Sequence, residues 1–186
     1  LDVEQLSDGI RSMLAMVGDI AFRCIKLNPH HGVSAASQTS GVVMIDEVDM
    51  HLHPRWQQMI LGQLQDAFPK IQFVVTTHSP QVLTTVPSNC IRILRDNKAY
   101  AAPPGTEGAE PERMLKQVLG LKEIRPSTLQ ATKELKEYLA LVDRDQWSSP
   151  RALELRELLD DRYQGQEPAL FEADLHIENR KWELNE

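Results

Sequence analysis

The sequence predicts an α/β protein, in which parallel strands joined by crossover helices and closed by a β-hairpin are followed by an α-helical C-terminal region. Two apolar runs, residues 42–45 and 71–77, flank a segment with helical periodicity, an arrangement typical of a parallel strand-helix-strand unit. After a stretch rich in proline and glycine at residues 103–111, only helical patterns follow. At 186 residues, of which 41% are hydrophobic, the chain is long enough to bury a core.

The first half of the chain carries the elements of this unit. Apolar residues at helical spacing stop before Asn28-Pro29, which predicts a helix of about five turns that begins at Ser7-Asp8. Residues 42–45 are all apolar and predict a strand buried on both faces. A second helix is expected to begin at Pro54 and to bury one residue in every four, namely Trp56, Ile60, Leu64 and Phe68.

The remaining elements follow from the same patterns. The β-branched run at residues 71–77 predicts a second buried strand, and two short runs joined around Asp96-Asn97 predict the closing hairpin. Helices are expected at four places: Arg113–Leu119, Leu129–Val142 with a capping box of Ser127 and Gln130, a segment capped by Ser149-Pro150, and a last helix after Pro168 on which Phe171, Leu175 and Trp182 share a face. We therefore divide the chain into an α/β part at residues 1–102, a linker at 103–112 and a helical part at 113–186.

Charge and composition exclude several classes of protein. The net charge of −7 argues against a basic surface, although it leaves room for a local groove that holds nucleic acid. No run of about 18 apolar residues and no targeting segment is present, so we expect a cytoplasmic protein without a membrane span. The two cysteines, Cys24 and Cys90, are expected in the core. Because the chain begins with Leu1 close to a motif that normally lies deep in a domain, we expect a missing N-terminal part.

The first candidate site follows the first strand, where the string GVVMIDE ends in two acids. A hard cation such as Mg²⁺ is held by one carboxylate together with water and phosphates, which suits Asp46. Glu47 is one residue further along and points elsewhere, so it is placed to polarise an attacking water molecule. An ordinary strand end is the alternative, and only the surrounding motifs decide between the two.

Three motifs in order supply that context: LSDGIR, then GVVMIDEVDMHLHP, then FVVTTHSP. This set resembles the signature motif, the Walker B motif with its D-loop, and the switch histidine of ABC-type ATPases, within the branch of RecF-like and overcoming-lysogenization-defect ATPases. The resemblance covers residues 3–88. It implies that residues 1–102 are the C-terminal part of an ATPase domain, a partial ABC-ATPase lobe with ATP and Mg²⁺ as cofactors.

The resemblance also implies individual roles. Asp46 would hold Mg²⁺, Glu47 would be the general base, Asp49 would lie in the D-loop at a dimer seam, and His78 would contact the γ-phosphate. The signature residues Ser7, Gly9 and Arg11 would act in trans on the nucleotide of another subunit, so that the protein works as a homodimer or a higher oligomer. A helix N-terminus offers free N–H groups there, and glycine lets a phosphate approach the backbone.

Plainer readings exist for the same residues. Ser7 and Asp8 are preferred helix-capping residues, and His78 is compatible with an ordinary strand end. His51 and His53 suggest a metal site, but a zinc site needs further ligands that the sequence does not supply nearby. No glycine heads the phosphate-binding string G-x-x-x-x-G-K-[ST], so this stretch alone is expected to be inactive in ATP hydrolysis.

The helical tail resembles that of the PtuA-like ATPases of Septu and retron anti-phage defence systems. This implies an ATPase subunit whose ATP state controls an HNH nuclease of the PtuB type, with a reverse transcriptase and its RNA-DNA product as further partners and DNA reached through the complex. Two alternatives stay open: a RecF- or SMC-like DNA-repair ATPase, and a non-catalytic assembly module. A Toprim nuclease is disfavoured, because Asp143 and Asp145 follow a helical pattern rather than a strand.

Overall fold

The computed structural model describes residues 7–184 and divides the chain into two compact units between Ile124 and Arg125. This boundary lies beyond the predicted linker at residues 103–112. Within that segment Thr106 is fully buried, and its hydroxyl donates a hydrogen bond to the carbonyl of Val86 at 2.8 Å. The helix that follows, α6 (Pro111–Gln117), also packs on the first unit, because its Met114 is buried in the same cluster as Leu83 and Ile91.

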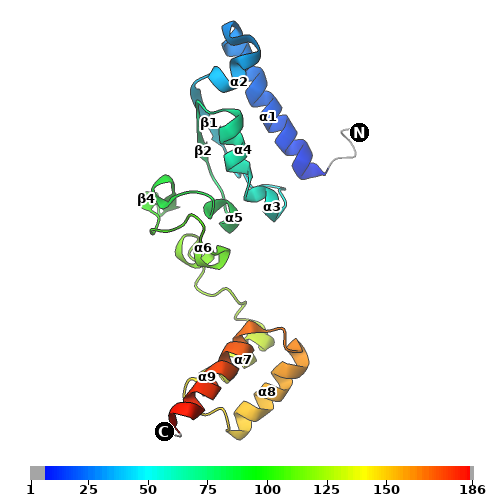
Figure 1. Cartoon of the computed structure of the whole chain (residues 1–186), viewed down its shortest axis with the longest axis vertical. Coiled ribbons are helices and arrows are strands. Elements are labelled where there is room, and N and C mark those ends of the chain that lie inside the picture. The colour runs from blue at the N-terminus through cyan, green and yellow to red at the C-terminus, as the bar shows by residue number, and fades with distance from the viewer. Residues whose placement is uncertain (1–6, 185–186) are drawn as a thin grey trace. The chain divides into compact units, whose positions relative to one another are not determined.

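The first unit is built on the predicted parallel pair of strands (Figure 1). Strands β1 (Gly41–Ile45) and β2 (Ile71–Val75) run parallel, in register from Gly41 opposite Ile71 to Ile45 opposite Val75. The crossover between them contains α3 (Pro54–Gln57) and α4 (Ile60–Ala67). Because the strands are parallel, their carboxyl ends lie at one edge of the sheet, where the candidate site begins.

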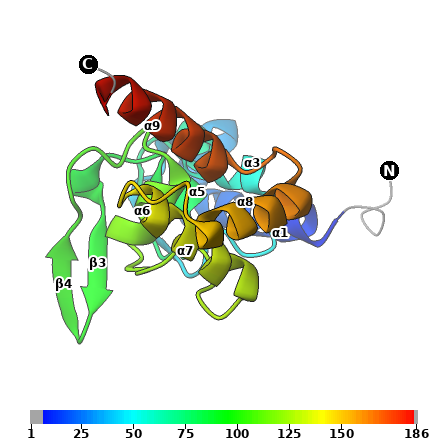
Figure 2. The same ribbon diagram turned by 90° about the horizontal axis from the view of Figure 1, so that it is seen from below.

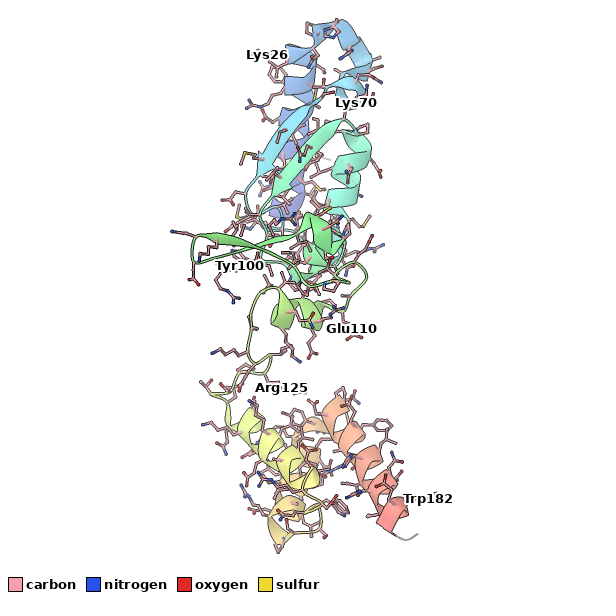
Figure 3. The ribbon with its side chains drawn as sticks, turned by 90° about the vertical axis from the view of Figure 1, so that its left-hand side faces the viewer. Lys26, Lys70, Tyr100, Glu110, Arg125 and Trp182 are labelled. Carbon is pink, nitrogen blue, oxygen red and sulfur yellow. The ribbon has the colours of Figure 1, made fainter. Side chains whose placement is uncertain are left out.

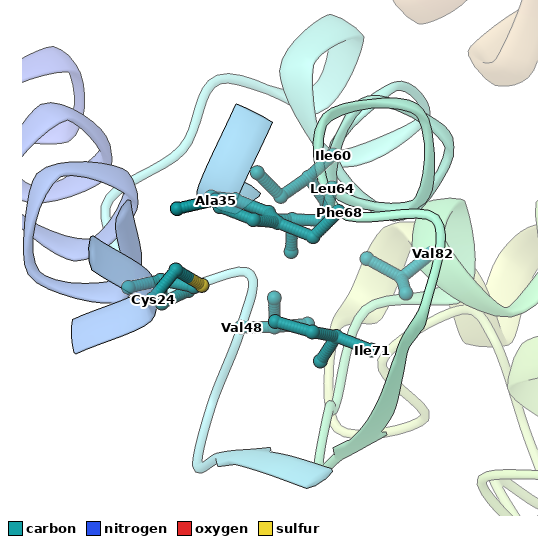
Figure 4. Close-up of a cluster of buried hydrophobic side chains, with 9 residues drawn as sticks. Cys24, Ala35, Val48, Ile60, Leu64, Phe68, Ile71 and Val82 are labelled. Carbon is teal, nitrogen blue, oxygen red and sulfur yellow. The ribbon is translucent and has the colours of Figure 1, made fainter. Parts of the chain in front are cut away.

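The core of this unit lies on one face of the sheet (Figure 4). Helix α1 (Asp8–Leu27) contributes Ile20 and Cys24, which confirms the expectation for Cys24, and α4 contributes Ile60 and Leu64, each only 1% exposed. The short turns η2 (Pro29–Ser34) and α2 (Ala35–Gln38) connect α1 to β1. Both long helices therefore cover the same side of the two strands.

The opposite face of the sheet is open, so the prediction of strands buried on both faces is wrong for this chain. Val42, Met44 and Val74 are 61%, 79% and 46% exposed. Val43 and Phe73, which are the adjacent residues within the two strands, pack against the core. The reason is that α1 and α4 lie on one side, and no described element covers the other.

The predicted second helix is interrupted. The backbone of Met59 (φ −108°, ψ −24°) separates α3 from α4, and its N–H bonds to the carbonyl of Trp56, three residues back, at 3.0 Å. Because this turn is tighter than an α-helical turn, Trp56 on α3 is not aligned with the buried residues Ile60 and Leu64 on α4. Trp56 is accordingly 37% exposed. Of the four residues expected to be buried, Ile60, Leu64 and Phe68 are.

A hairpin closes the first unit as predicted (Figure 2). After α5 (Pro80–Leu83) and η3 (Ser88–Cys90), strand β3 (Arg92–Arg95) pairs antiparallel with β4 (Lys98–Ala101). Asp96 and Asn97 both adopt positive φ angles, 49° and 57°. These left-handed values belong to a two-residue primed turn, which Asp and Asn tolerate without glycine. Cys90 is exposed, so its expected place in the core is wrong.

The second unit packs three helices, α7 (Gln130–Val142), α8 (Pro150–Tyr163) and α9 (Pro168–Leu184), around a core of their own. Leu135, Leu155 and Leu159 are at most 2% exposed. Ion pairs link elements distant in sequence, such as Arg162 with Glu134 at 2.6 Å. Asp145 lies just after a helix and pairs with Arg180, which agrees with the rejection of a strand-borne nuclease acid there.

Two helix starts in this unit test the capping predictions. The Ser149 hydroxyl accepts a hydrogen bond from the Ala152 N–H at 3.3 Å, as expected. The capping box of Ser127 and Gln130 is absent: Leu129 occupies the cap position, and the Gln130 amide instead donates to Glu134 at 3.0 Å. This hydrogen bond is the main reason why the pKa of Glu134 lies below its ordinary value, and Arg162 lowers it further.

Candidate functional site

The site begins where β1 and β2 end. Asp46 and Thr76 are the next residues after the paired Ile45 and Val75. The Thr76 hydroxyl donates a hydrogen bond to the Asp46 carboxylate and accepts one from the Glu47 N–H at 2.8 Å. A single threonine therefore holds the first acid and the backbone of the second against the end of β2.

Glu47 leaves the strand at a left-handed turn, with a φ of 51°. Such a value is unfavourable for a residue with a side chain and is found where surrounding contacts hold the backbone. Here the next residue, Val48, is 5% exposed and its N–H bonds to the Thr76 carbonyl at 3.1 Å. Glu47 itself is exposed, and its carboxylate makes no hydrogen bond or ion pair within the described residues.

His78 lies two residues beyond Thr76, at the same edge of the sheet. It is exposed, whereas its neighbours are fixed: Thr77 donates to the Asp49 carboxylate, and Ser79 is 5% exposed. The structure thus brings the segments that carry Asp46, Glu47, Asp49 and His78 together. It also shows Asp49 engaged by Thr77 within the chain.

The residues predicted to form the signature motif lie at the start of α1. Ser7 occupies the cap position, but its hydroxyl makes no capping bond, and Arg11 forms an ion pair with Asp8. Gly9 is buried, and a Cβ added to it would lie 2.3 Å from the carbonyl oxygen of His51. Glycine is therefore needed here for close packing against residues 46–53, the loop between β1 and α3 that carries Asp49 (the Asp49 loop). This reason differs from the approach of a phosphate that the sequence suggested.

The part of the chain that the structure describes gathers no zinc-type set of ligands around His51 and His53. The His53 ring accepts a hydrogen bond from the Arg55 N–H at 3.3 Å and so caps α3. Among residues 7–184 no three His, Cys, Asp or Glu side chains gather as a metal site would require. A Mg²⁺ ion makes a smaller demand, because one carboxylate with waters and phosphates suffices. The exposed Asp46, with the Thr76 hydroxyl beside it, fits that donor set.

The sequence motifs assigned no role to four residues of the site, namely Thr76, Thr77, Gln57 and Ser79. The two threonines were taken as part of a buried strand, yet both hydroxyls bind the acid segment. Hydroxyl residues directly before a candidate histidine were the available signal. Gln57 gave no such signal, since its partners lie 5, 8 and 22 residues away.

A second candidate surface lies on α9. Phe171, Leu175 and Trp182 share one face, as predicted, and are 67%, 47% and 74% exposed. Trp182 is labelled near the end of this helix in Figure 3. The opposite face, with Leu170 and Ala173, packs into the three-helix core. An apolar stripe of this kind on a solvent face is typical of a surface that binds another protein.

Comparison with known proteins shows what the chain is similar to. Residues 1–84 match the family described as "AAA domain, putative AbiEii toxin, Type IV TA system". The "Retron Ec83 probable ATPase" of Escherichia coli is 41% identical over 183 residues, which cover 98% of this chain. The chain is thus similar to that retron ATPase over nearly its whole length. It spans 33% of the length of the Ec83 protein.

Further relatives give the same result. The "Retron Vc95 probable ATPase" of Vibrio cholerae serotype O1 biovar El Tor is 46% identical over 96 residues, 52% of this chain and 18% of that protein. A "Septu protein PtuA" of Bacillus thuringiensis is 29% identical over 145 residues, 73% of this chain and 37% of that protein. The predicted resemblance to PtuA-like ATPases is thus confirmed. Within residues 7–184, no helix is both long enough and apolar enough to cross a membrane.

Proposed function

We propose that this chain supplies the acidic and histidine-bearing part of a cytoplasmic, Mg²⁺-dependent ATPase of an anti-phage defence complex, within a longer polypeptide that provides the phosphate-binding loop. The observation that carries the proposal is the hydrogen-bonded edge at which Thr76 joins Asp46 and the backbone of Glu47 to the segment of His78. The homology to a retron ATPase over 98% of the chain supports it.

The roles follow from what each side chain is free to do. Asp46 would hold Mg²⁺, and the ion would supply positive charge against the terminal phosphates. Glu47, whose carboxylate has no partner in the described residues, accepts a proton from the attacking water. His78 projects from an anchored segment and donates to the γ-phosphate.

A second copy completes the site in this proposal. Ser7 offers an unused hydroxyl at the start of α1, beside free backbone N–H groups that favour an anion. Arg11 exchanges its Asp8 partner for a phosphate of the other copy's nucleotide. Gly9 acts indirectly, because its packing under His51 sets the position of α1 relative to the Asp49 loop.

The helical unit provides the contact with effector proteins. The apolar stripe of Phe171, Leu175 and Trp182 on α9 is left open by the three-helix core. We assign it to an HNH-type nuclease partner, whose activity the ATP state controls. In a retron system, a reverse transcriptase and its RNA-DNA product complete the complex.

The decisive experiment replaces Glu47 by Gln in the natural full-length polypeptide. Loss of a general base lowers turnover by about 10²- to 10⁴-fold, and we expect the variant to trap a nucleotide-bound dimer detectable by light scattering. The matched control is Glu107→Gln, an exposed glutamate outside the site, which should keep normal turnover. ATP hydrolysis at the parent rate by Glu47→Gln would contradict the assignment.

A further inference from the structure

A hydrogen-bond network joins the Asp49 loop to residues 76–79, which carry His78 (the His78 segment). Gln57 lies at the centre of this network. The Gln57 side-chain nitrogen donates to the carbonyls of Leu52 at 2.9 Å and of Asp49 at 3.3 Å. Its side-chain oxygen accepts from the Ser79 hydroxyl at 2.8 Å. One amide on α3 therefore contacts both segments that follow the two strands.

The chemistry of the partners fixes the orientation of this amide. Both carbonyls can only accept hydrogen bonds, so the NH₂ group must face them. The oxygen then faces Ser79, whose hydroxyl donates to it while accepting from the Val82 N–H at 3.2 Å. A carboxylate of the same shape would set an oxygen against two carbonyl oxygens. Glutamine is thus required, rather than merely a polar residue of this length.

A second link runs parallel to the first. The Thr77 hydroxyl donates to the Asp49 carboxylate and accepts from the Ser79 N–H at 3.0 Å. Ser79 is only 5% exposed, so the bonds that it makes are shielded from water. Breaking them leaves buried polar groups unsatisfied, which is costly. The two segments are accordingly held together at both Asp49 and Leu52.

We infer that Gln57 is a positioning residue that makes the Asp49 loop and the His78 segment move as one unit. The inference rests on the proposed function in so far as these segments carry catalytic groups. His78 is held between Thr77 and Ser79, and Asp49 shares the Thr77 contact. A shift of the loop at a subunit seam is therefore transmitted to the histidine, and displacements of about 1 Å at reacting groups cost about 10²-fold in rate.

Hydrogen exchange tests the coupling without requiring hydrolysis. In Gln57→Glu, the amides of Met50 and Leu52 in one segment and of Ser79 and Val82 in the other should all exchange at least about tenfold faster, because both segments lose the link through Gln57 and keep only the one through Thr77. Ser79→Ala should accelerate Met50 and Leu52 as well. Gln58→Glu is the matched control, since this neighbour is exposed, and it should change neither segment.

Faster exchange confined to one segment, or an equal effect of Gln58→Glu, would overturn the inference. A kinetic test in the full-length polypeptide then addresses positioning. Gln57→Glu should lower kcat more than tenfold with KM for ATP unchanged, and adding Ser79→Ala should cost little more, because both changes break the same link. An unchanged kcat would overturn the positioning role. If the parent and Gln58→Glu both fail to hydrolyse ATP, the proposed function fails, while the exchange result still decides the coupling.

Discussion

Alanine substitutions at two glycines of the same helix should have opposite effects on stability. Both Gly9 and Gly18 lie in α1. Replacing a helical glycine by alanine normally stabilises a helix by up to about 1 kcal/mol, because the backbone loses less entropy on folding. At Gly18 an added Cβ meets nothing within 4 Å, so Gly18→Ala should gain close to that amount.

At Gly9 the same Cβ would lie 2.3 Å from the carbonyl oxygen of His51 and 3.6 Å from the Cα of Leu52. Both are backbone atoms, so no side chain can turn away to relieve the contact. Relief requires α1 or the Asp49 loop to move by roughly 1 Å, and forced repacking of this kind costs about 1–3 kcal/mol. Set against the helix gain of up to about 1 kcal/mol, this cost predicts a net loss of about 0–2 kcal/mol for Gly9→Ala, which should lie about 1–3 kcal/mol below Gly18→Ala.

Urea unfolding measures both variants. Trp56 reports on the first unit once Trp147 and Trp182, which lie in the second, are replaced by phenylalanine. A shifted midpoint with an unchanged dependence on urea would show a change in stability rather than in the unfolded state. If Gly9→Ala proved as stable as Gly18→Ala, the contact between α1 and the Asp49 loop would not exist in solution, and the packing reason for glycine would be refuted.

Three further predictions concern the second unit. Leu159→Ala should cost about 2–5 kcal/mol, since this side chain is fully buried, whereas Leu153→Ala, at a side chain 59% exposed, should cost under about 0.5 kcal/mol; thermal unfolding distinguishes the two. Arg125 hydrogen bonds lower the pKa of Glu167 below its ordinary value of 4.5, so that pair stabilises the unit above about that pH and stops doing so as the pH falls through the lowered pKa. Glu167→Gln should therefore lower Tm at pH 7, by an amount that shrinks as the pH falls below 4.5 and through the lowered pKa, and a loss that does not change with pH would contradict the ion pair. Phe171→Glu should abolish co-purification with the nuclease partner without lowering Tm, because this residue is 67% exposed; retained binding would remove α9 as the docking surface.

Local chemistry determined much of this structure. Helical spacing up to Asn28-Pro29, apolar runs that end in polar residues, and Asp96-Asn97 at a turn each depend on neighbours in sequence, and each produced the expected element. The order of the strands then placed Asp46 and the segment of His78 at one sheet edge, as parallel pairing requires. The resemblance of the helical tail also predicted the similarity to retron and Septu ATPases.

Tertiary packing decided what neighbours in sequence do not specify. An apolar strand face has the same pattern whether or not a helix covers it, so the exposure of Met44 followed only from the placement of α1 and α4 on one side. The close approach of His51 to Gly9 and the bonds of Gln57 to Ser79 join residues 42 and 22 positions apart. Such contacts depend on how distant parts of the chain pack together. The sequence therefore predicted candidate reacting groups, whereas only the folded chain revealed what holds them in place.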